Sequence, residues 1–318
     1  MDFTLVLLLG VTVLLGLSIG ATGVSTCFAT TFGSGILSHK KSLLVVFIFL
    51  IVGSMMQGNH VTKTISKGLV DISSLSFQAS IAMILGASIL LLLFAFYGIP
   101  SSNTQAIVGS LLGVSLILEA SINWNKFLML FIFWILTPLI AIFFGGLSYY
   151  FISKILENAN ILKFERYIKY FVVGSMIFLS YSFGASHVGL VVGLMSNQTL
   201  ISVSELTILA ALSMGFGAIF FSKRVTLAIG KKITELDPRM AFSSQTGGAI
   251  TIYMMAILGV PTSSTQAMVG GIAGTGLSKS IATVDKSQLW KIFRGWVITP
   301  LLGAFLGILS FYTLGAIL

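Results

Sequence analysis

Two nearly identical polar stretches contain the residues whose types and spacing most clearly suggest chemistry. GIPSSNTQ begins at Gly98 in the first half of the chain, and GVPTSSTQ begins at Gly259 in the second half. Hydroxyl and amide side chains are typical caps of helix N-termini, and they donate hydrogen bonds. The first peptide N–H groups of a helix lack partners within it and carry partial positive charge, so two such helix starts can bind an anion without Lys or Arg. The predicted anion-binding residues are Ser102, Asn103, Thr104 and Gln105, together with Ser263, Ser264, Thr265 and Gln266.

A second pair of similar stretches is rich in glycine and follows long apolar segments. SIGATGV begins at Ser18, and SFGASHV begins at Ser182, which is almost the same spacing as between the two proline stretches. Small residues let helices approach each other closely, or let a helix unwind and expose its carbonyls. We assign backbone bends to Gly20, Gly184, Pro100 and Pro261, and we expect Thr22, Ser25, Ser186 and His187 to line the site.

His187 is the one ionisable residue in these four stretches. An ionisable residue inside a membrane is a functional candidate by default, and histidine can carry a proton near neutral pH. His187 is therefore the candidate for a coupling proton. A neutral ring that hydrogen-bonds between helices remains an equal alternative.

The composition identifies the surroundings of these motifs as lipid. The 318 residues are 56% hydrophobic and 8% charged, whereas soluble domains contain about 25% charged residues. The apolar runs are continuous and reach the ~20 residues that span a bilayer as a helix. This predicts an all-α polytopic protein of the cell membrane rather than a β-barrel. The net charge of +9 lies in short loops, where it sets topology, and does not indicate nucleic-acid binding.

The matched motifs recur in the same order at a nearly constant spacing, which indicates an internal duplication. We predict a first transmembrane repeat at 1–156, a polar connecting loop at 157–163 and a second repeat at 164–318. Repeats of this kind are typical of secondary transporters, with the site where the two copies meet. The helices expected after each proline are too short to cross a bilayer, so each Gly-x-Pro stretch predicts a re-entrant hairpin. The basic loops favour inverted topology for the two repeats.

With these motifs in place, the sequence resembles the inorganic phosphate transporter (PiT) family, and most closely its sulfate permease branch. Family members carry two copies each of a G-A-N-D-V-A-N motif and a G-x-P-x-S-x-T-H-like motif. The second motif is well kept at 98–105 and 259–266, whereas Gly23 and His187 replace the aspartates of the first. The resemblance covers the whole chain. It implies the PiT-like fold, alternating access and transport of an inorganic oxyanion.

The lost aspartates bear on the coupling ion, because in the family they are associated with sodium. Their absence favours H+ over Na+. The donor-rich motifs contain no carboxylate, which favours sulfate over the protonated phosphate ion. A sodium- or proton-coupled phosphate transporter and an uncoupled anion channel remain the alternatives.

Other classes of function find little support in the sequence. There is no intramembrane Asp pair and no H-E-x-x-H motif, so we expect no enzyme, no metal and no cofactor. The expected partners are the sulfate or phosphate substrate and the lipid bilayer. GxxxG-like pairs, Gly109–Gly113 and Gly270–Gly274, could pack helices within the chain or form a homodimer.

Overall fold

The computed structural model describes residues 3–157, 161–195, 201–233, 236–279 and 285–316. Within these ranges the chain is helical apart from turns, extended connections and one isolated bridge between Val70 and Ile122, which confirms the all-α prediction. The first half contains α1 (Phe3–Thr22), α2 (Ser25–Gly33), α3 (His39–Gln57), α4 (Asn59–Lys63), the π-helix η1 (Thr64–Leu69), the 3-10 helix η2 (Ile72–Ser74), α5 (Phe77–Tyr97), α6 (Asn103–Ile117) and α7 (Trp124–Glu157). The second half contains α8 (Ile161–Met195), α9 (Val203–Phe221), α10 (Lys223–Lys232), α11 (Pro238–Ile257), α12 (Ser264–Lys279) and α13 (Lys286–Gly315).

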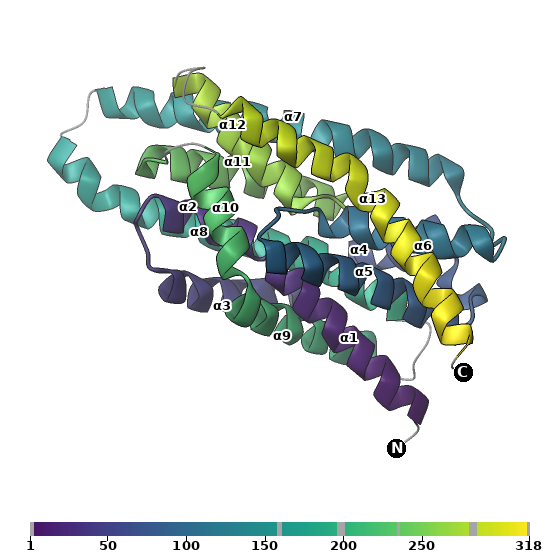
Figure 1. Ribbon diagram of the computed structural model, residues 1–318. Helices are drawn as coiled ribbons and strands as arrows, with labels where there is room; N and C mark the ends of the chain where they lie inside the picture. The colour runs from purple at the N-terminus through teal and green to yellow at the C-terminus, as the bar shows by residue number, and fades with distance from the viewer. Residues whose placement is uncertain (1–2, 158–160, 196–200, 234–235, 280–284, 317–318) are drawn as a thin grey trace.

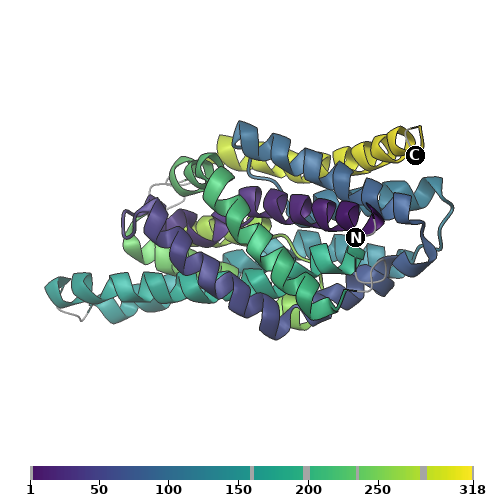
Figure 2. The ribbon, with the colours of Figure 1, turned by 90° about the horizontal axis from the view of Figure 1, so that it is seen from below.

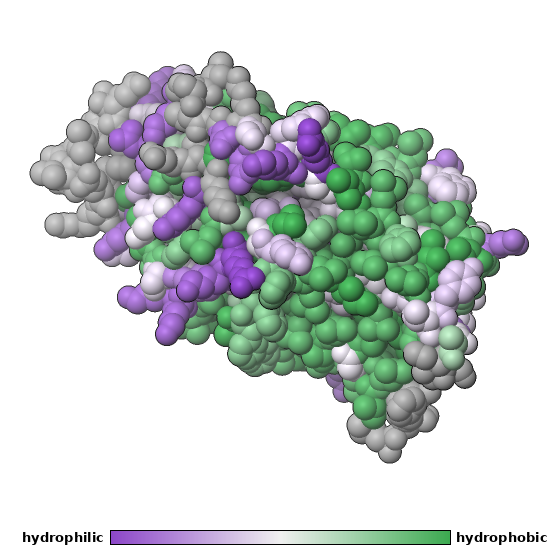
Figure 3. All heavy atoms as spheres, viewed as in Figure 1, coloured by the Kyte–Doolittle hydropathy of each residue, from purple (hydrophilic) through white to green (hydrophobic). Residues whose placement is uncertain are grey.

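Seven helical segments of the described chain are long and apolar enough to cross a membrane. The apolar run at 244–258, within α11, is not among them, because Ser244, Gln245 and other polar residues lower its hydropathy. Hydrophobic side chains form a broad band across the face in Figure 3, and hydrophilic side chains gather toward its two ends. The protein is therefore a multi-pass integral membrane protein.

The two halves interlock instead of forming separate bundles. α1 packs on α9 and α3 on α8, while α7 packs on α11 and α12 and α13 packs on α5 and α6. The long helices cross the length of the molecule, and the adjoining ends of α7 and α8 extend beyond the other helices (Figures 1 and 2). Each half thus supplies surfaces that bury the apolar helices of the other.

The two GxxxG-like pairs pack within the chain. A Cβ atom on Gly109 would lie 2.2 Å from the carbonyl oxygen of Pro300 in α13. A Cβ atom on Gly270 would lie 2.5 Å from the carbonyl oxygen of Pro138 in α7. These glycines are used where α6 and α12 cross the long helices, so they do not argue for a homodimer, which stays a prediction.

Gly20 and Gly184 lie inside continuous helices, so their assignment as backbone bends was wrong. A Cβ atom on Gly20 would lie 1.9 Å from the Met214 carbonyl oxygen, and one on Gly184 would lie 2.1 Å from the Leu50 carbonyl oxygen. Both glycines therefore permit close helix crossings. In the first half the helix is interrupted only after Thr22, where α2 begins at Ser25; α8 is uninterrupted through Gly184.

The close crossing at Gly184 gives a matched pair of variants in one helix. Gly184→Ala is expected to destabilise the protein by about 1–3 kcal/mol, because the methyl group must displace backbone of α3. Gly174→Ala is the control, since nothing lies within 4 Å of a Cβ atom there. Thermal unfolding of the purified protein measures both variants. Equal stability of the two would contradict the packing role of Gly184.

Candidate functional site

Each Gly-x-Pro stretch turns at its glycine. Gly98 and Gly259 both have a φ of +66°, a conformation that favours glycine. The N–H of Gly98 donates to the Ala95 carbonyl at 3.1 Å, and the N–H of Gly259 donates to the Ala256 carbonyl at 3.0 Å. A short segment without regular secondary structure follows each turn and leads into α6 or α12. Pro100 and Pro261 lie in these segments, so the bends occur two residues earlier, at Gly98 and Gly259, and not at the prolines.

The serine two residues after each proline caps the following helix. The Gln105 N–H donates to Ser102 Oγ at 3.2 Å, and the Gln266 N–H donates to Ser263 Oγ at 3.2 Å. Loss of such a cap typically costs about 1 kcal/mol. These two hydroxyls therefore fix the helix starts.

Reciprocal hydrogen bonds hold the two hairpins against each other. Thr104 Oγ1 donates to the Thr262 carbonyl at 2.6 Å, and Thr265 Oγ1 donates to the Ser101 carbonyl at 2.7 Å. All four residues are almost completely buried. The starts of α6 and α12, which belong to different halves of the sequence, thus meet in the protein interior.

Several buried polar atoms around this junction have no hydrogen-bond partner. They include Ser101 Oγ, Gln105 Oε1 and Gln266 Oε1 on the hairpins, and Ser186 Oγ on α8. Leaving such an atom unpaired costs about 1–3 kcal/mol, and native proteins leave few of them. These unpaired groups are atoms that a polar ligand can satisfy, with each Gln amide able to present its oxygen or its NH2 group.

Asn103 connects the first hairpin to the glycine-rich stretch of α1. Thr22 Oγ1 donates to Asn103 Oδ1 at 2.6 Å. A Cβ atom on Gly23 would lie 2.0 Å from Asn103 Nδ2 and 2.9 Å from the ring of Phe183. The absence of a side chain at Gly23 therefore gives the Asn103 amide its place between α1 and α8.

His187 lies in the same region and is fully buried. Its ring stacks on Phe183, with centroids 3.9 Å apart and planes at 11°. Neither ring nitrogen makes a well-formed hydrogen bond. Among the described residues, no acidic side chain is buried, so no carboxylate faces the ring.

Ser25 does not join the hairpin junction. Its hydroxyl donates to the Ser222 carbonyl at 3.2 Å, where α9 meets α10. Ser264 is 2% exposed at the start of α12, next to the capping serine. The structure thus brings Thr22, Asn103 and the hairpin residues together, with Ser186 and His187 on the neighbouring α8.

Thr137 is a site residue that the sequence motifs did not identify. Its Oγ1 atom lies 2.7 Å from Thr262 Oγ1 on the second hairpin. Thr137 belongs to the repeated Trp-x-x-Thr-Pro pattern, whose other copy contains Thr299. The indole nitrogens of both copies, on Trp134 and Trp296, are buried and unpaired. This pattern was a signal that α7 contributes to the site through Thr137.

A second buried polar cluster joins α2, α8 and α11. Gln245 Nε2 donates to Thr31 Oγ1 at 2.5 Å, and Ser175 Oγ donates to Gln245 Oε1 at 2.7 Å. All three residues are buried. At the spacing of the two proline-containing stretches, the first half has Ile84 in place of Gln245, so comparison of the two halves of the sequence could not reveal this cluster.

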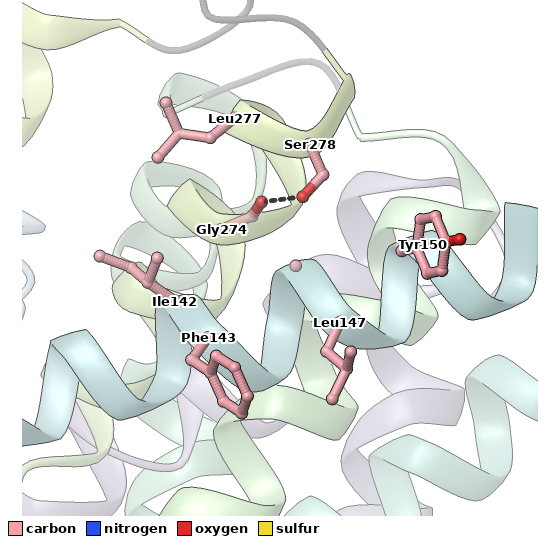
Figure 4. A pocket seen from close by; sticks show the side chains of 8 residues that line it. Ile142, Phe143, Leu147, Tyr150, Gly274, Leu277 and Ser278 are labelled. Carbon is pink, nitrogen blue, oxygen red and sulfur yellow. Dashed lines mark hydrogen bonds between the residues drawn. The ribbon is translucent and has the colours of Figure 1, made fainter.

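The hollow in Figure 4 is separate from the hairpin junction. It measures about 400 Å³ and lies between α7 and α12, where apolar side chains such as Phe143 and Leu147 line it. Ser278 is its one hydroxyl from α12, and this group already donates to the Gly274 carbonyl at 2.9 Å. The hollow lacks the unpaired polar atoms that mark the junction.

The fold and the buried polar junction define a class of protein. A multi-pass helical protein with its polar site between two interlocked halves has the architecture of secondary transporters. The chain belongs to the phosphate transporter family, whose model matches residues 19–307. This is a family of transporters and not of enzymes.

The chain is similar to proteins named for two different anions. A Methanocaldococcus jannaschii protein named "putative phosphate permease" is 30% identical, with 91% of each chain covered. The sulfate permease CysP of Bacillus subtilis is 26% identical, with 90% of this chain and 81% of that protein covered. A solved structure titled "The sodium-dependent phosphate transporter" has a TM-score of 0.91 and 20% identity, with all of both chains covered. This last similarity establishes the fold.

Proposed function

We propose that the protein is a secondary active symporter of an inorganic tetrahedral oxyanion, with sulfate favoured and protons as the coupling ion. The observation that carries this proposal is the buried meeting of two helix starts with unpaired polar side chains. Partial positive charge and peptide N–H groups at both helix starts suit an anion. Alternating access would open this junction first to one side of the membrane and then to the other.

The preference for sulfate rests on the chemistry of the side chains. Hydroxyl and amide groups supply donors around the junction, and the described interior holds no carboxylate. Sulfate is fully deprotonated at neutral pH and only accepts hydrogen bonds. The 26% identity to a sulfate permease supports the same substrate.

Phosphate is the second candidate, and a specific observation favours it. Gln105 Oε1 and Gln266 Oε1 are buried and unpaired, so either could accept a hydrogen bond from the O–H group of a protonated phosphate ion. The relative named for phosphate and the sodium-dependent structural neighbour support this candidate. Sodium coupling would then use carbonyl and hydroxyl oxygens.

Proton coupling is supported by the two positions where the resemblance leads us to expect aspartate. Gly23 has no side chain that could act as a ligand, and the Asn103 amide fills the space that a side chain at position 23 would occupy. His187 is buried with two unpaired ring nitrogens and, among the described residues, no facing carboxylate. A bound dianion would supply the counter-charge that a protonated ring needs, so proton and anion would bind together.

The repeats are proposed to be inverted, at 1–156 and 164–318 with the connection at 157–163. α6 has 15 residues and α12 has 16, which makes each about 22–24 Å long and too short for a bilayer core of about 30 Å. Their starts meet inside the protein. Two re-entrant hairpins that enter from opposite sides account for both observations.

Uptake into proteoliposomes tests the function. Labelled sulfate and phosphate would be supplied in parallel under an inward proton gradient, an inward sodium gradient or neither. We expect sulfate to accumulate with the proton gradient alone. Sodium-driven accumulation of phosphate would establish the second candidate instead, and flux that never becomes concentrative would identify an uncoupled channel.

The unpaired glutamines permit a test of the binding site itself. Gln105→Leu and Gln266→Leu remove polar groups whose oxygens have no partner in the protein, so neither should cost much stability. Each is expected to raise the KM of anion uptake at least tenfold, since one lost hydrogen bond to a charged ligand is worth about 1.5–3 kcal/mol. Gln57→Leu is the control, because Gln57 lies on α3 and bonds to Tyr253. An unchanged KM in both site variants would exclude the hairpin junction.

A further inference from the structure

We propose that the groove between the end of α5 and the start of α10 is a binding site for one anionic phospholipid. The groove lies where α9 ends, and two cations of α10, Lys223 and Arg224, stand beside it. The acyl chains would fill the apolar part of the groove. The head-group phosphate would bind the two cations.

The groove has the size and the lining of a site for lipid chains. Its volume is about 740 Å³. Phe96 is 61% exposed and Phe220 is 69% exposed, although both are large apolar side chains. The remaining lining is also apolar and comes from α5 and α9, at Ile89, Leu92, Leu93, Ala95 and Phe221.

Arg224 is held in place at the mouth of the groove. Its Nη1 atom donates to the Phe96 carbonyl, and its guanidinium lies over the Phe96 ring, 4.8 Å from the centroid. A guanidinium has five N–H donors, so several remain for the oxygens of a phosphate. The ring and the carbonyl thus orient this cation before any lipid arrives.

Within the described chain, the two cations have no acidic partner. An ion pair does form elsewhere, between Lys279 and Asp237 at 2.9 Å. Both Lys223 and Arg224 are exposed beside an apolar, lipid-facing groove. Paired cations without a counter-charge at such a place complement an anionic head group, whereas a zwitterionic lipid brings a positive charge of its own.

The groove lies at a suitable depth in the membrane. α5 has 21 residues and α9 has 19, long enough to reach from one surface close to the other, and both end at the groove. Hydrophilic side chains gather where α10 lies, beside the apolar band (Figure 3). Lys and Arg near membrane surfaces attract anionic lipids, and most of them lie on the cytoplasmic side.

The matched place in the other half has a different character. At the spacing of the glycine-rich stretches, the counterparts of Lys223 and Arg224 are Asn59 and His60. The hollow beside Gly259 is smaller, about 220 Å³, and contains a single cation, Lys126. The paired cations therefore belong to one half only, which makes Lys126 a matched control.

Native mass spectrometry of the purified full chain tests the proposal. The protein would be titrated with phosphatidylglycerol or with phosphatidylcholine of the same acyl chains. We expect the wild type to retain one phosphatidylglycerol and to bind phosphatidylcholine at least tenfold more weakly. The double variant Lys223→Gln/Arg224→Gln should bind phosphatidylglycerol about thirtyfold more weakly, because each cation near an anionic surface contributes about fivefold in affinity. Lys126→Gln should bind it like the wild type.

Three results would overturn the proposal. The first is equal binding of phosphatidylglycerol and phosphatidylcholine by the wild type, a result that does not depend on the folding of any variant. The second is equal retention of phosphatidylglycerol by the double variant. The third is displacement of the lipid by millimolar sulfate or inorganic phosphate, since the cations would then serve the transported anion.

Discussion

His187→Gln is expected to abolish accumulation of the anion under a proton gradient while exchange of internal for external anion continues. His187 is the one basic side chain that is buried in the described chain, and neither of its ring nitrogens makes a well-formed hydrogen bond. Glutamine keeps a polar group of similar length but cannot carry a proton. The accumulation ratio should fall at least tenfold, a loss equivalent to about 1.4 kcal/mol or more of driving force.

The measurement is anion uptake with an inward proton gradient, compared with counterflow at equal pH on both sides. His60→Gln is the control, because His60 is exposed at the start of α4. Proton-driven accumulation that survives in His187→Gln would contradict the coupling role. Loss of both accumulation and exchange would show instead that the ring matters for packing on Phe183.

The meeting of the two proline-containing stretches could be predicted from the sequence, because similar polar residues recur in both halves of the chain. Two copies of a proline followed by hydroxyl and amide residues are improbable as packing features, and their helix starts do meet. The roles within each copy could not be predicted. Ser102 and Thr104 are both small hydroxyl residues of one stretch, yet the first caps its own helix and the second bonds to the other hairpin. Only the relative position of the two halves distinguishes them.

The glycine-rich stretches show a structural feature that the sequence pattern could not predict. A glycine in an apolar helix permits either a bend or a close crossing, and the sequence does not choose. The choice is made by the partner backbone, at Met214 for Gly20 and at Leu50 for Gly184, which lies far away in the chain. Both contacts depend on how the halves interlock, so the bend assignments failed for a tertiary reason.

The buried cluster around Gln245 shows the opposite limit. The repeat comparison weights residues that occur twice, and Gln245 occurs once. Its partners, Thr31 and Ser175, lie on two other helices. A single polar residue within an apolar helix predicts a buried hydrogen-bond partner, but the sequence does not indicate which residue that partner is.

Gly23→Ala is expected to reduce anion uptake at least tenfold. The added Cβ atom would lie 2.0 Å from Asn103 Nδ2 and 2.9 Å from the Phe183 ring, so the Asn103 amide must leave its place. Overpacking of this kind costs about 1–3 kcal/mol, and here the displaced group belongs to the proposed anion site. Gly10→Ala in the neighbouring helix α1 is the control, because nothing lies within 4 Å of a Cβ atom there. Initial uptake rates, normalised to the folded protein in the liposomes, measure the effect.

A second substitution, at Asn103, tests whether Gly23→Ala reduces uptake by displacing the Asn103 amide or by its contact with Phe183. Ser264 occupies the position in the second hairpin that matches Asn103, so serine is a residue that this architecture accepts. In Gly23→Ala/Asn103→Ser the shorter side chain leaves room for the new methyl group. We therefore expect the double variant to recover uptake to the level of Asn103→Ser alone. If uptake stays as low as in Gly23→Ala, the contact with Phe183 is the cause, and the first half of the site depends on the packing of α1 on α8 instead of on the Asn103 amide.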